Sequence, residues 1–285
     1  MDDDDVLDLH EAAEDGSLAE VVELAGRVAD VDAEYEGRTA LWVAVYEGRH
    51  DVARALVAAG ADPWRPMMSG WSPGRLSLAG PEPGLFERPA GVVGLSEDEA
   101  AAVAEAARLT AVLGGVEYDG FSLACVAGIS AAEAARRLEA TVEVIDPEEL
   151  LDEIDPFEEE SLAFVGVTDV PGGCVVSQPW GYVPNTPGVT RRLSAGTVCY
   201  AMYANPKSGD QGSVARDGEI VGWDEIPGGA PEEDDGPREV LLSYLYQGNP
   251  AAYCCASAGL RVADERVVTG PPDVWLCLPE RDHWT

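Results

Sequence analysis

The feature that most constrains the fold is a sequence pattern that recurs near the N-terminus. Residues 9–16 read LHEAAEDG, and residues 41–48, which begin 32 positions later, read LWVAVYEG. An Ala-Asp pair at residues 29–30 returns at the same interval, at residues 61–62. A fixed interval of this length predicts copies of one short helical unit that stack, because a single unit cannot bury its own apolar face.

The second copy contains the signals of two consecutive helices. Thr39 stands where its hydroxyl can accept a hydrogen bond from the first turn of a helix, and Gly48 is of the residue type that commonly ends one. The apolar positions of the first helix are Leu41, Ala44 and Val45, and those of the second are Val52, Ala55, Leu56 and Ala59. Their spacing places each set on one face, so we expect two antiparallel helices that end at Gly60.

The repeat pattern stops after two full units. In the first unit, Ser17 and Glu20 form an S-x-x-E capping box before the second helix. A third unit begins at Gly70, 33 positions after Gly37, but the sequence GPEPG at residues 80–84 breaks its helical pattern. Since arrays of this kind need about three units to bury a continuous core, we expect this one to pack against another domain of the chain.

The repeat resembles the ankyrin repeat. Residues 37–41, GRTAL, stand at the G-x-T-P-L-H position of that family. Ala40 replaces its proline and Trp42 its histidine, whereas His10 keeps the histidine in the first unit. The resemblance implies a turn, two antiparallel helices and a Gly-Ala-Asp loop in each unit. It also implies binding of proteins, and not catalysis, through the turn tips and the inner helices.

Ten residues at the turn tips, on the inner helices and in the segment that follows are candidates for contact with a partner protein. They are Glu34, Tyr35, Glu36, Arg38, Trp42, Tyr46, Trp64, Met67, Met68 and Trp71. The alternative is that the tryptophans and methionines pack against the domain that follows. The sequence is compatible with both interpretations.

The rest of the chain predicts an α+β domain behind a short helical solenoid. Residues 81–95 are rich in proline and glycine and are expected to link a domain of residues 1–80 to one of residues 96–285. Apolar spacing predicts helices at residues 96–113, 130–138 and 251–258, and strands at residues 121–127, 162–168, 174–178, 193–204 and 219–223. Residues 240–246 fit either a helix or a strand. This order predicts a mixed, mostly antiparallel sheet domain.

Residues 118–281 resemble an uncharacterised domain family of actinobacterial proteins. Four segments carry the resemblance: DGFSLACVAGISAAEAARRLEA, GGCVVSQPWGYV, RRLSAGTVCYAMYANPKS and ARDGEIVGWDEIP. The second of these is followed by PNTPG and is longer than the family pattern. These motifs mark a fold, and the resemblance implies no activity and no catalytic residue.

The charge of the chain limits the partners to be expected. The sequence has 53 acidic and 18 basic residues, a formal net charge of −35 and a pI near 4.1. Such a surface repels nucleic acid and anionic lipid. It either attracts a basic protein or serves only to keep the protein in solution, and the composition is compatible with both. The N-terminus lacks the features of a signal peptide, and no apolar run is long enough to span a membrane. We therefore expect a cytoplasmic protein whose six cysteines stay reduced and mostly pack in the core.

Residues with reactive chemistry are sparse and scattered. The three histidines, His10, His50 and His283, lie far apart in the sequence. Residues 120–124, GFSLA, match only half of a nucleophile elbow, and neither phosphate-binding glycine motif is present. We therefore expect no catalytic residue, no cofactor and no metal site.

The leading hypothesis is a non-enzymatic interaction protein that binds a basic partner, for instance as an immunity or antitoxin protein. The first alternative is a regulatory or scaffold protein whose C-terminal domain binds a small ligand. An aromatic pocket formed by Trp180, Tyr182, Tyr200, Tyr203 and Trp223 would distinguish it. The second alternative is an enzyme of unknown type, which a cleft with converging ionisable groups would reveal.

Overall fold

The computed structural model describes residues 3–116, 120–144, 146–153, 155 and 158–284. The chain divides into two compact units. The first comprises residues 1–104 and 230–245, and the second comprises residues 105–229 and 246–285. Each unit is described by itself below.

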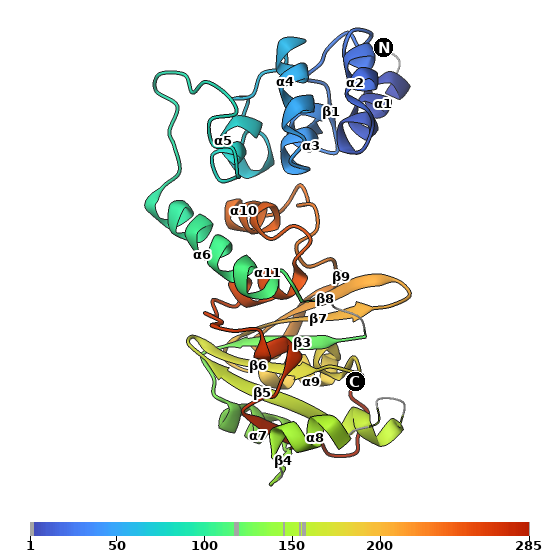
Figure 1. Ribbon diagram of the computed structural model, residues 1–285, viewed down its shortest axis with the longest axis vertical. Coiled ribbons are helices and arrows are strands. Elements are labelled where there is room, and N and C mark those ends of the chain that lie inside the picture. Colours follow the sequence, from blue (N-terminus) through green and yellow to red (C-terminus); the bar gives the residue numbers. More distant parts are fainter. Residues whose placement is uncertain (1–2, 117–119, 145, 154, 156–157, 285) are drawn as a thin grey trace. The chain divides into compact units, whose positions relative to one another are not determined.

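The first unit begins with two pairs of helices (Figure 1). They are α1 (Asp3–Glu14) with α2 (Leu18–Ala25), and α3 (Ala40–Tyr46) with α4 (His50–Ala58). Between the pairs, β1 (Glu34–Tyr35) and β2 (Arg38–Thr39) form an antiparallel ribbon that we call the finger, residues 34–39. The helices α1 and α3 pack side by side, as do α2 and α4. This arrangement confirms the two stacked helical units that the repeat predicts.

Local signals in the sequence set the ends of these helices as expected. The Thr39 hydroxyl accepts a hydrogen bond from the Trp42 backbone N–H at 3.2 Å. Ser17 and Glu20 form the reciprocal capping box at the start of α2. Gly48 follows α3 with a φ of +67°, a left-handed conformation in which a side chain would be strained.

Two side chains connect the first helical pair to the second. The Arg49 guanidinium donates hydrogen bonds to the carbonyl oxygens of Ala12 and Ala13 at 2.8 and 3.0 Å, and to that of Gly16. These carbonyls lie at the C-terminus of α1, where the helix dipole also stabilises a cation. His10 is buried, and its ring nitrogens lie 2.8 Å from the Val6 oxygen and 3.0 Å from the Arg38 oxygen. His10 therefore fixes α1 against the finger.

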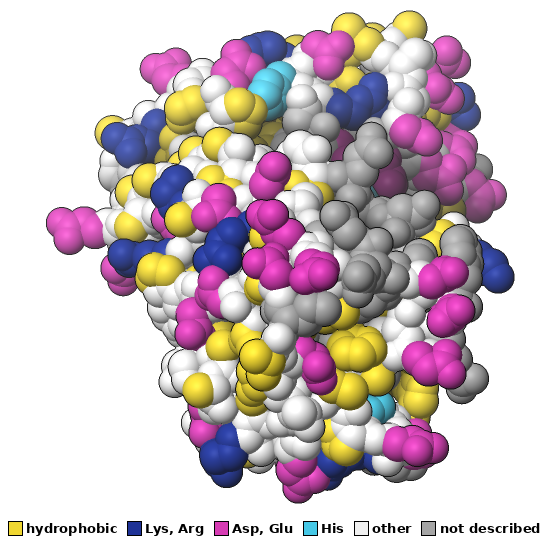
Figure 2. All heavy atoms as spheres, turned by 60° about the horizontal axis from the view of Figure 1, so that its bottom comes forward, with side chains coloured by type: hydrophobic (Ala, Val, Ile, Leu, Met, Phe, Trp, Pro, Cys, Tyr) yellow, Lys and Arg dark blue, Asp and Glu magenta, His cyan; other side chains and the backbone are white. Residues whose placement is uncertain are grey.

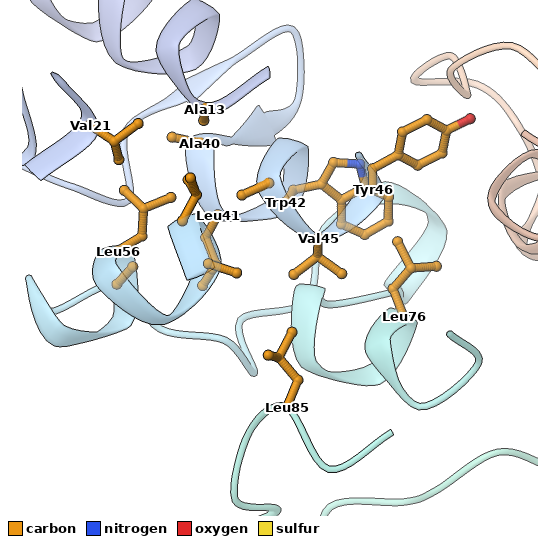
Figure 3. Close-up of a cluster of buried hydrophobic side chains, with 14 of the residues drawn as sticks. Ala13, Val21, Ala40, Leu41, Trp42, Val45, Tyr46, Leu56, Leu76 and Leu85 are labelled. Atoms are coloured by element: carbon orange, nitrogen blue, oxygen red, sulfur yellow. The ribbon is translucent and has the colours of Figure 1, made fainter. Parts of the chain in front are cut away.

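The third unit is incomplete, and a helix from far along the chain takes its place. After η1 (Met68–Gly70) and the short α5 (Pro73–Ser77), the ankyrin-like pattern ends. The helix α10 (Pro237–Leu245) then contributes Val240 and Leu241 to the core that also holds Trp71 and Leu76 (Figure 3 shows part of this core). The expected support thus comes from a segment that is distant in the sequence but belongs to the same unit as the repeats, and not from a separate domain as expected.

Hydrogen bonds as well as apolar contacts hold α10 on this unit. The Trp71 indole N–H donates to the Pro237 carbonyl oxygen at 2.8 Å, and the Tyr46 hydroxyl donates to the Ser243 backbone carbonyl oxygen at 3.3 Å. The Tyr244 hydroxyl lies so close to Gly80 that the tyrosine side chain would have to shift to admit a larger residue there. The segment 230–245 is therefore an integral part of the first unit.

The observed division differs from the expected domains of residues 1–80, 81–95 and 96–285. Within the segment expected to be a linker, Leu85 is buried in the core of the first unit, and the Glu87 carbonyl oxygen accepts a hydrogen bond from the Trp64 indole N–H at 3.1 Å. The boundary instead falls within α6 (Glu97–Leu113), after Ala104. The reason is that residues 81–104 and 230–245 both contribute apolar side chains to the core of the first unit, namely Leu85, Leu95, Val103, Val240 and Leu241.

The second unit is built on one antiparallel sheet of eight strands. The strand order is β4-β10-β5-β6-β3-β7-β8-β9. The strands are β3 (Ser122–Ala127), β4 (Thr141–Val142), β5 (Phe164–Val170), β6 (Gly173–Gln178), β7 (Val198–Asn205), β8 (Gly209–Arg216), β9 (Glu219–Glu225) and β10 (Val274–Cys277). All neighbouring pairs are antiparallel. The fold is therefore α+β, as predicted.

Helices cover both faces of this sheet. On one face, α7 (Ala131–Leu138) and α9 (Pro187–Leu193) share a core with Ala124 and Val126 of β3. Side chains alternate along a strand, so Cys125 points to the other face, where its sulfur lies 3.4 Å from Cys255 in α11 (Pro250–Ser257). Burial on both faces explains why residues 121–127 form an unbroken apolar run. The other short elements are α8 (Pro147–Glu153), η2 (Glu159–Ala163), η3 (Val183–Asn185) and α12 (Arg266–Thr269).

Several elements of this unit differ from the sequence expectations. The strand expected at residues 193–204 is preceded by α9, which begins with Pro187 and ends at Leu193, so β7 starts only at Val198. The strands β8 and β10 were not expected. In the first unit, residues 240–245 are helical, as part of α10, and Tyr246 follows the end of that helix.

Candidate protein-interaction surface

A hollow of 260 Å³ lies between the finger and the inner helices of the first unit. Its lining combines residues of α1, the finger and α3 with one residue of the distant segment. These residues are Leu7, His10, Glu11, Glu14, Tyr35, Glu36, Arg38, Trp42, Val43, Tyr46, Glu47 and Ala230.

A second hollow of 670 Å³ adjoins the first along the finger. It is lined by Glu36, Arg38, Ala230, Pro231, Glu232, Glu233 and Asp234. We call the residues that line the two hollows the finger surface. Gly37 forms the tip of the finger with a φ of +70°, and a Cβ atom there would lie 3.0 Å from the Glu233 carboxylate. The glycine thus allows the segment 230–234 to approach the finger closely.

The finger surface is strongly acidic. Seven carboxylates line it: Glu11, Glu14, Glu36, Glu47, Glu232, Glu233 and Asp234. Among the described residues of the surface, Arg38 is the only arginine or lysine, and its guanidinium donates to the Glu36 carboxylate at 2.8 Å. The aromatic rings of Tyr35, Trp42 and Tyr46 lie beside these charges. An acidic rim with aromatic rings suits a cationic binding partner.

Five of the ten residues proposed from the sequence for partner contact lie on the finger surface. They are Tyr35, Glu36, Arg38, Trp42 and Tyr46. Glu34 lies on the finger outside this lining, where its carboxylate pairs with Arg65 at 2.6 Å.

Four of the ten residues are buried in the core, namely Trp42, Tyr46, Met68 and Trp71. Trp71 is completely buried and bonded to α10, so it offers no surface to a partner. Trp64 and Met67 are partly buried, and Trp64 lines a separate hollow of 360 Å³ with Leu85 and Phe86. The observed contacts of the four buried residues lie within the first unit, in the core that also contains Val240 and Leu241 of α10.

Sequence reasoning missed the acidic part of the finger surface. Glu11 and Glu14 are three residues apart in α1 and therefore share a helix face, so their proximity could have been found. Residues 230–234 lie almost 200 positions from the finger, and nothing in their composition indicates that they return to it.

The second unit holds part of the aromatic group expected of a ligand pocket. Tyr182 lies 6.0 Å from Tyr203 and 5.6 Å from Trp284, and Trp223 lies 6.4 Å from Trp284, between ring centroids. Tyr182 and Trp284 line a hollow of 610 Å³. Trp180 instead stacks on Trp275 at 5.4 Å. Of the five residues expected to form the pocket, only Tyr182 is in the lining of this hollow.

The serine of the partial nucleophile-elbow motif lies within the sheet, and most of the cysteines are buried. Ser122 begins β3 and pairs with Gln178 and Tyr203 inside the sheet, whereas a nucleophile elbow requires a sharp turn between a strand and a helix. All six cysteines are free thiols, and burial raises the pKa of Cys174 to about 12. No three His, Cys, Asp or Glu side chains in the described ranges are placed to hold a metal ion.

Comparison with known families agrees with the geometry of the first unit. A family model described as "Ankyrin repeats (3 copies)" matches residues 5–67, which include both helical pairs and the finger. No curated protein matches the chain. None of the described helices combines the length and apolar composition needed to cross a bilayer.

Proposed function

We propose that this chain, whose residues 5–67 are ankyrin repeats, is a non-enzymatic protein that binds a basic partner protein on its finger surface. Ankyrin repeats are protein-binding modules, and their turn tips and inner helices are the usual contact regions. The finger surface occupies that position. The observation that carries the proposal is its charge: seven carboxylates and one arginine, which is already paired with Glu36.

The charge of the whole chain supports the same partner. The net charge of −35 produces a long-range field that accelerates encounter with a basic protein and disfavours nucleic acid. Figure 2 shows acidic side chains spread across one face of the molecule, with fewer basic ones between them. We therefore expect association that weakens steeply with salt, because exposed charges are screened beyond about 8 Å at physiological ionic strength.

A concrete form of this proposal is an immunity or antitoxin protein that covers the basic active site of a toxin, such as a nuclease, in the cytoplasm. An acidic surface that fits such a site would block its substrate without any reaction of its own. The charge of the finger surface supports this form, and the identity of the partner would decide it.

A second candidate is binding of a small ligand by the second unit. The hollow beside Tyr182 and Trp284 has a volume of 610 Å³, which lies within the roughly 300–1,000 Å³ typical of small-molecule sites. A ligand there would change the fluorescence of Trp284, and a Trp284→Phe variant would lose that change.

Site-specific photo-crosslinking tests the main proposal. A benzophenone amino acid replaces Tyr35, which is 42% exposed on the finger, and in a control protein it replaces Val221, which is 61% exposed in the second unit. The full-length proteins are irradiated in extract from the source cells at low and high salt. At low salt, we expect one basic protein to be linked at position 35 and none at position 221. At high salt, we expect the linkage at position 35 to be lost. An acidic linked protein, or equal linkage at both positions, would contradict the proposal.

A further inference from the structure

We infer that the 260 Å³ hollow beneath the finger receives a single arginine side chain of the partner protein. This inference rests on the proposed function and specifies how the partner is recognised. Three observations support it: the volume of the hollow, the apolar and acidic residues that line it, and the buried indole N–H of Trp42, which has no acceptor among the described residues.

The size of the hollow favours one long side chain. A volume of 260 Å³ falls below the roughly 300 Å³ at which sites for drug-sized molecules begin. Leu7 and Val43 provide apolar walls, and the rings of Tyr35 and Trp42 lie beside them. The aliphatic stem of an arginine can pack on such walls while its planar guanidinium stacks on an aromatic ring.

The charges around the hollow favour a cationic head group. Glu11 and Glu14 line it from one face of α1, and within the described part of the chain neither carboxylate forms an ion pair. Arg38 cannot serve both of them, because it is paired with Glu36. A guanidinium can donate several hydrogen bonds to carboxylates at once, in a planar geometry that an ammonium group lacks.

Trp42 supplies the second, independent indication of a ligand. This side chain lines the hollow and is 1% exposed, and its indole N–H has no acceptor among the described residues. A buried donor without an acceptor is unfavourable, and native proteins rarely leave one. A backbone carbonyl beside the partner's arginine would supply the acceptor, whereas an anionic acceptor would be repelled by Glu11 and Glu14. Since the indole nitrogen is covered, a side chain at the rim must shift as the partner enters, which is common at interfaces.

The test uses the indole N–H signal of Trp42 in nitrogen-15 NMR spectra of the full-length protein. The signal is assigned by its loss in a Trp42→Phe variant. The probes are capped pentapeptides of sequence Gly-Ser-X-Ser-Gly at low salt, in which X is arginine, lysine or citrulline. Citrulline keeps the shape of arginine and lacks its charge. We expect the arginine peptide to shift the Trp42 signal, the lysine peptide to bind more weakly, and the citrulline peptide to have no effect.

Charge-neutralising variants locate the binding. The double variant Glu11→Gln and Glu14→Gln is expected to weaken binding of the arginine peptide by about 3- to 10-fold, as expected for loss of two partly exposed ion pairs. The control variant Glu148→Gln and Glu149→Gln makes the same change of charge in the second unit and should leave binding within about 2-fold.

The outcomes separate this inference from the proposed function. If the peptide binds but the Trp42 signal is unchanged, or if both double variants weaken binding equally, the arginine subsite is refuted while binding of basic partners stands. If no basic peptide binds and position 35 links no basic protein, both are refuted.

Discussion

Truncation of Leu241 should destabilise the ankyrin repeats, although this residue lies in α10, about 170 positions beyond them. Leu241 is 3% exposed and belongs to the hydrophobic core formed by α1 to α5. Replacement by alanine removes three buried carbon atoms, which contribute roughly 2.4 kcal/mol at about 0.8 kcal/mol each. The cavity left behind raises the loss to about 3 kcal/mol. That is a large share of the ~5–15 kcal/mol by which most domains are stable.

Urea denaturation and amide hydrogen exchange together measure this effect. The Leu241→Ala variant is compared with Val221→Ala, a truncation at an exposed position of β9 that should change stability by no more than about 0.5 kcal/mol. In the Leu241→Ala variant we expect faster exchange in α3, in η1 and α5, and in α10 itself. The reason is that these elements share one core.

The location of the loss decides whether α10 acts as part of the ankyrin stack. If faster exchange were confined to residues 237–245 while α3 and α5 kept their protection, α10 would be a peripheral helix. The view that it replaces the missing repeat would then be wrong. A loss of stability well under 1 kcal/mol would refute the burial argument as well.

Two further predictions concern single side chains of the first unit. Arg49→Met removes the hydrogen bonds to the Ala12 and Ala13 carbonyls and should reduce the free energy of unfolding by about 2–3 kcal/mol in urea titrations. The control Arg54→Met removes an exposed ion pair and should reduce the free energy of unfolding by under about 1 kcal/mol. Burial raises the pKa of the Tyr244 phenol from 10.0 to about 12. Unfolding therefore releases a proton between these values, so stability should fall as the pH rises from about 10 to 12, by at most about 1.4 kcal/mol per pH unit. Tyr244→Phe should show a shallower alkaline loss in urea titrations, and an identical loss would contradict this assignment.

The sequence predicts well those features that depend on neighbours in the chain. The caps at Ser17 and Thr39 form because the accepting hydroxyl oxygen and the donating backbone N–H are three residues apart. The continuous apolar run at residues 121–127 predicts β3, and the apolar patterns at residues 162–168 and 174–178 predict β5 and β6. Hydrogen bonds and apolar periodicity within a dozen residues are sufficient for such elements.

Other elements escaped prediction for physical reasons. The strand β8 reads GDQGSVAR, and its polar start hides the alternation that marks a strand. Residues 240–246 fit a helix or a strand because their apolar run is short, and only the shape of the ankyrin core selects the helix. From the sequence, Trp71 and Met68 are candidates for a binding surface. In the structure they are buried beside α10, and no local sequence pattern predicts that α10 packs there.

The position of α10 connects the stability of the first unit to its charge. The Trp71 indole N–H donates a hydrogen bond to the Pro237 carbonyl oxygen, and the absence of a side chain at Gly37 allows Glu233 to lie close to the finger. The residues that precede α10 therefore run along the finger. With α10 in this position, the carboxylates of Glu232, Glu233 and Asp234 line the same hollow as Glu36 of the finger. It follows that Leu241→Ala should weaken binding of a basic partner as well as destabilise the core, although Leu241 is absent from the finger surface. A variant with reduced stability and unchanged partner affinity would show that the segment 230–234 plays no part in recognition.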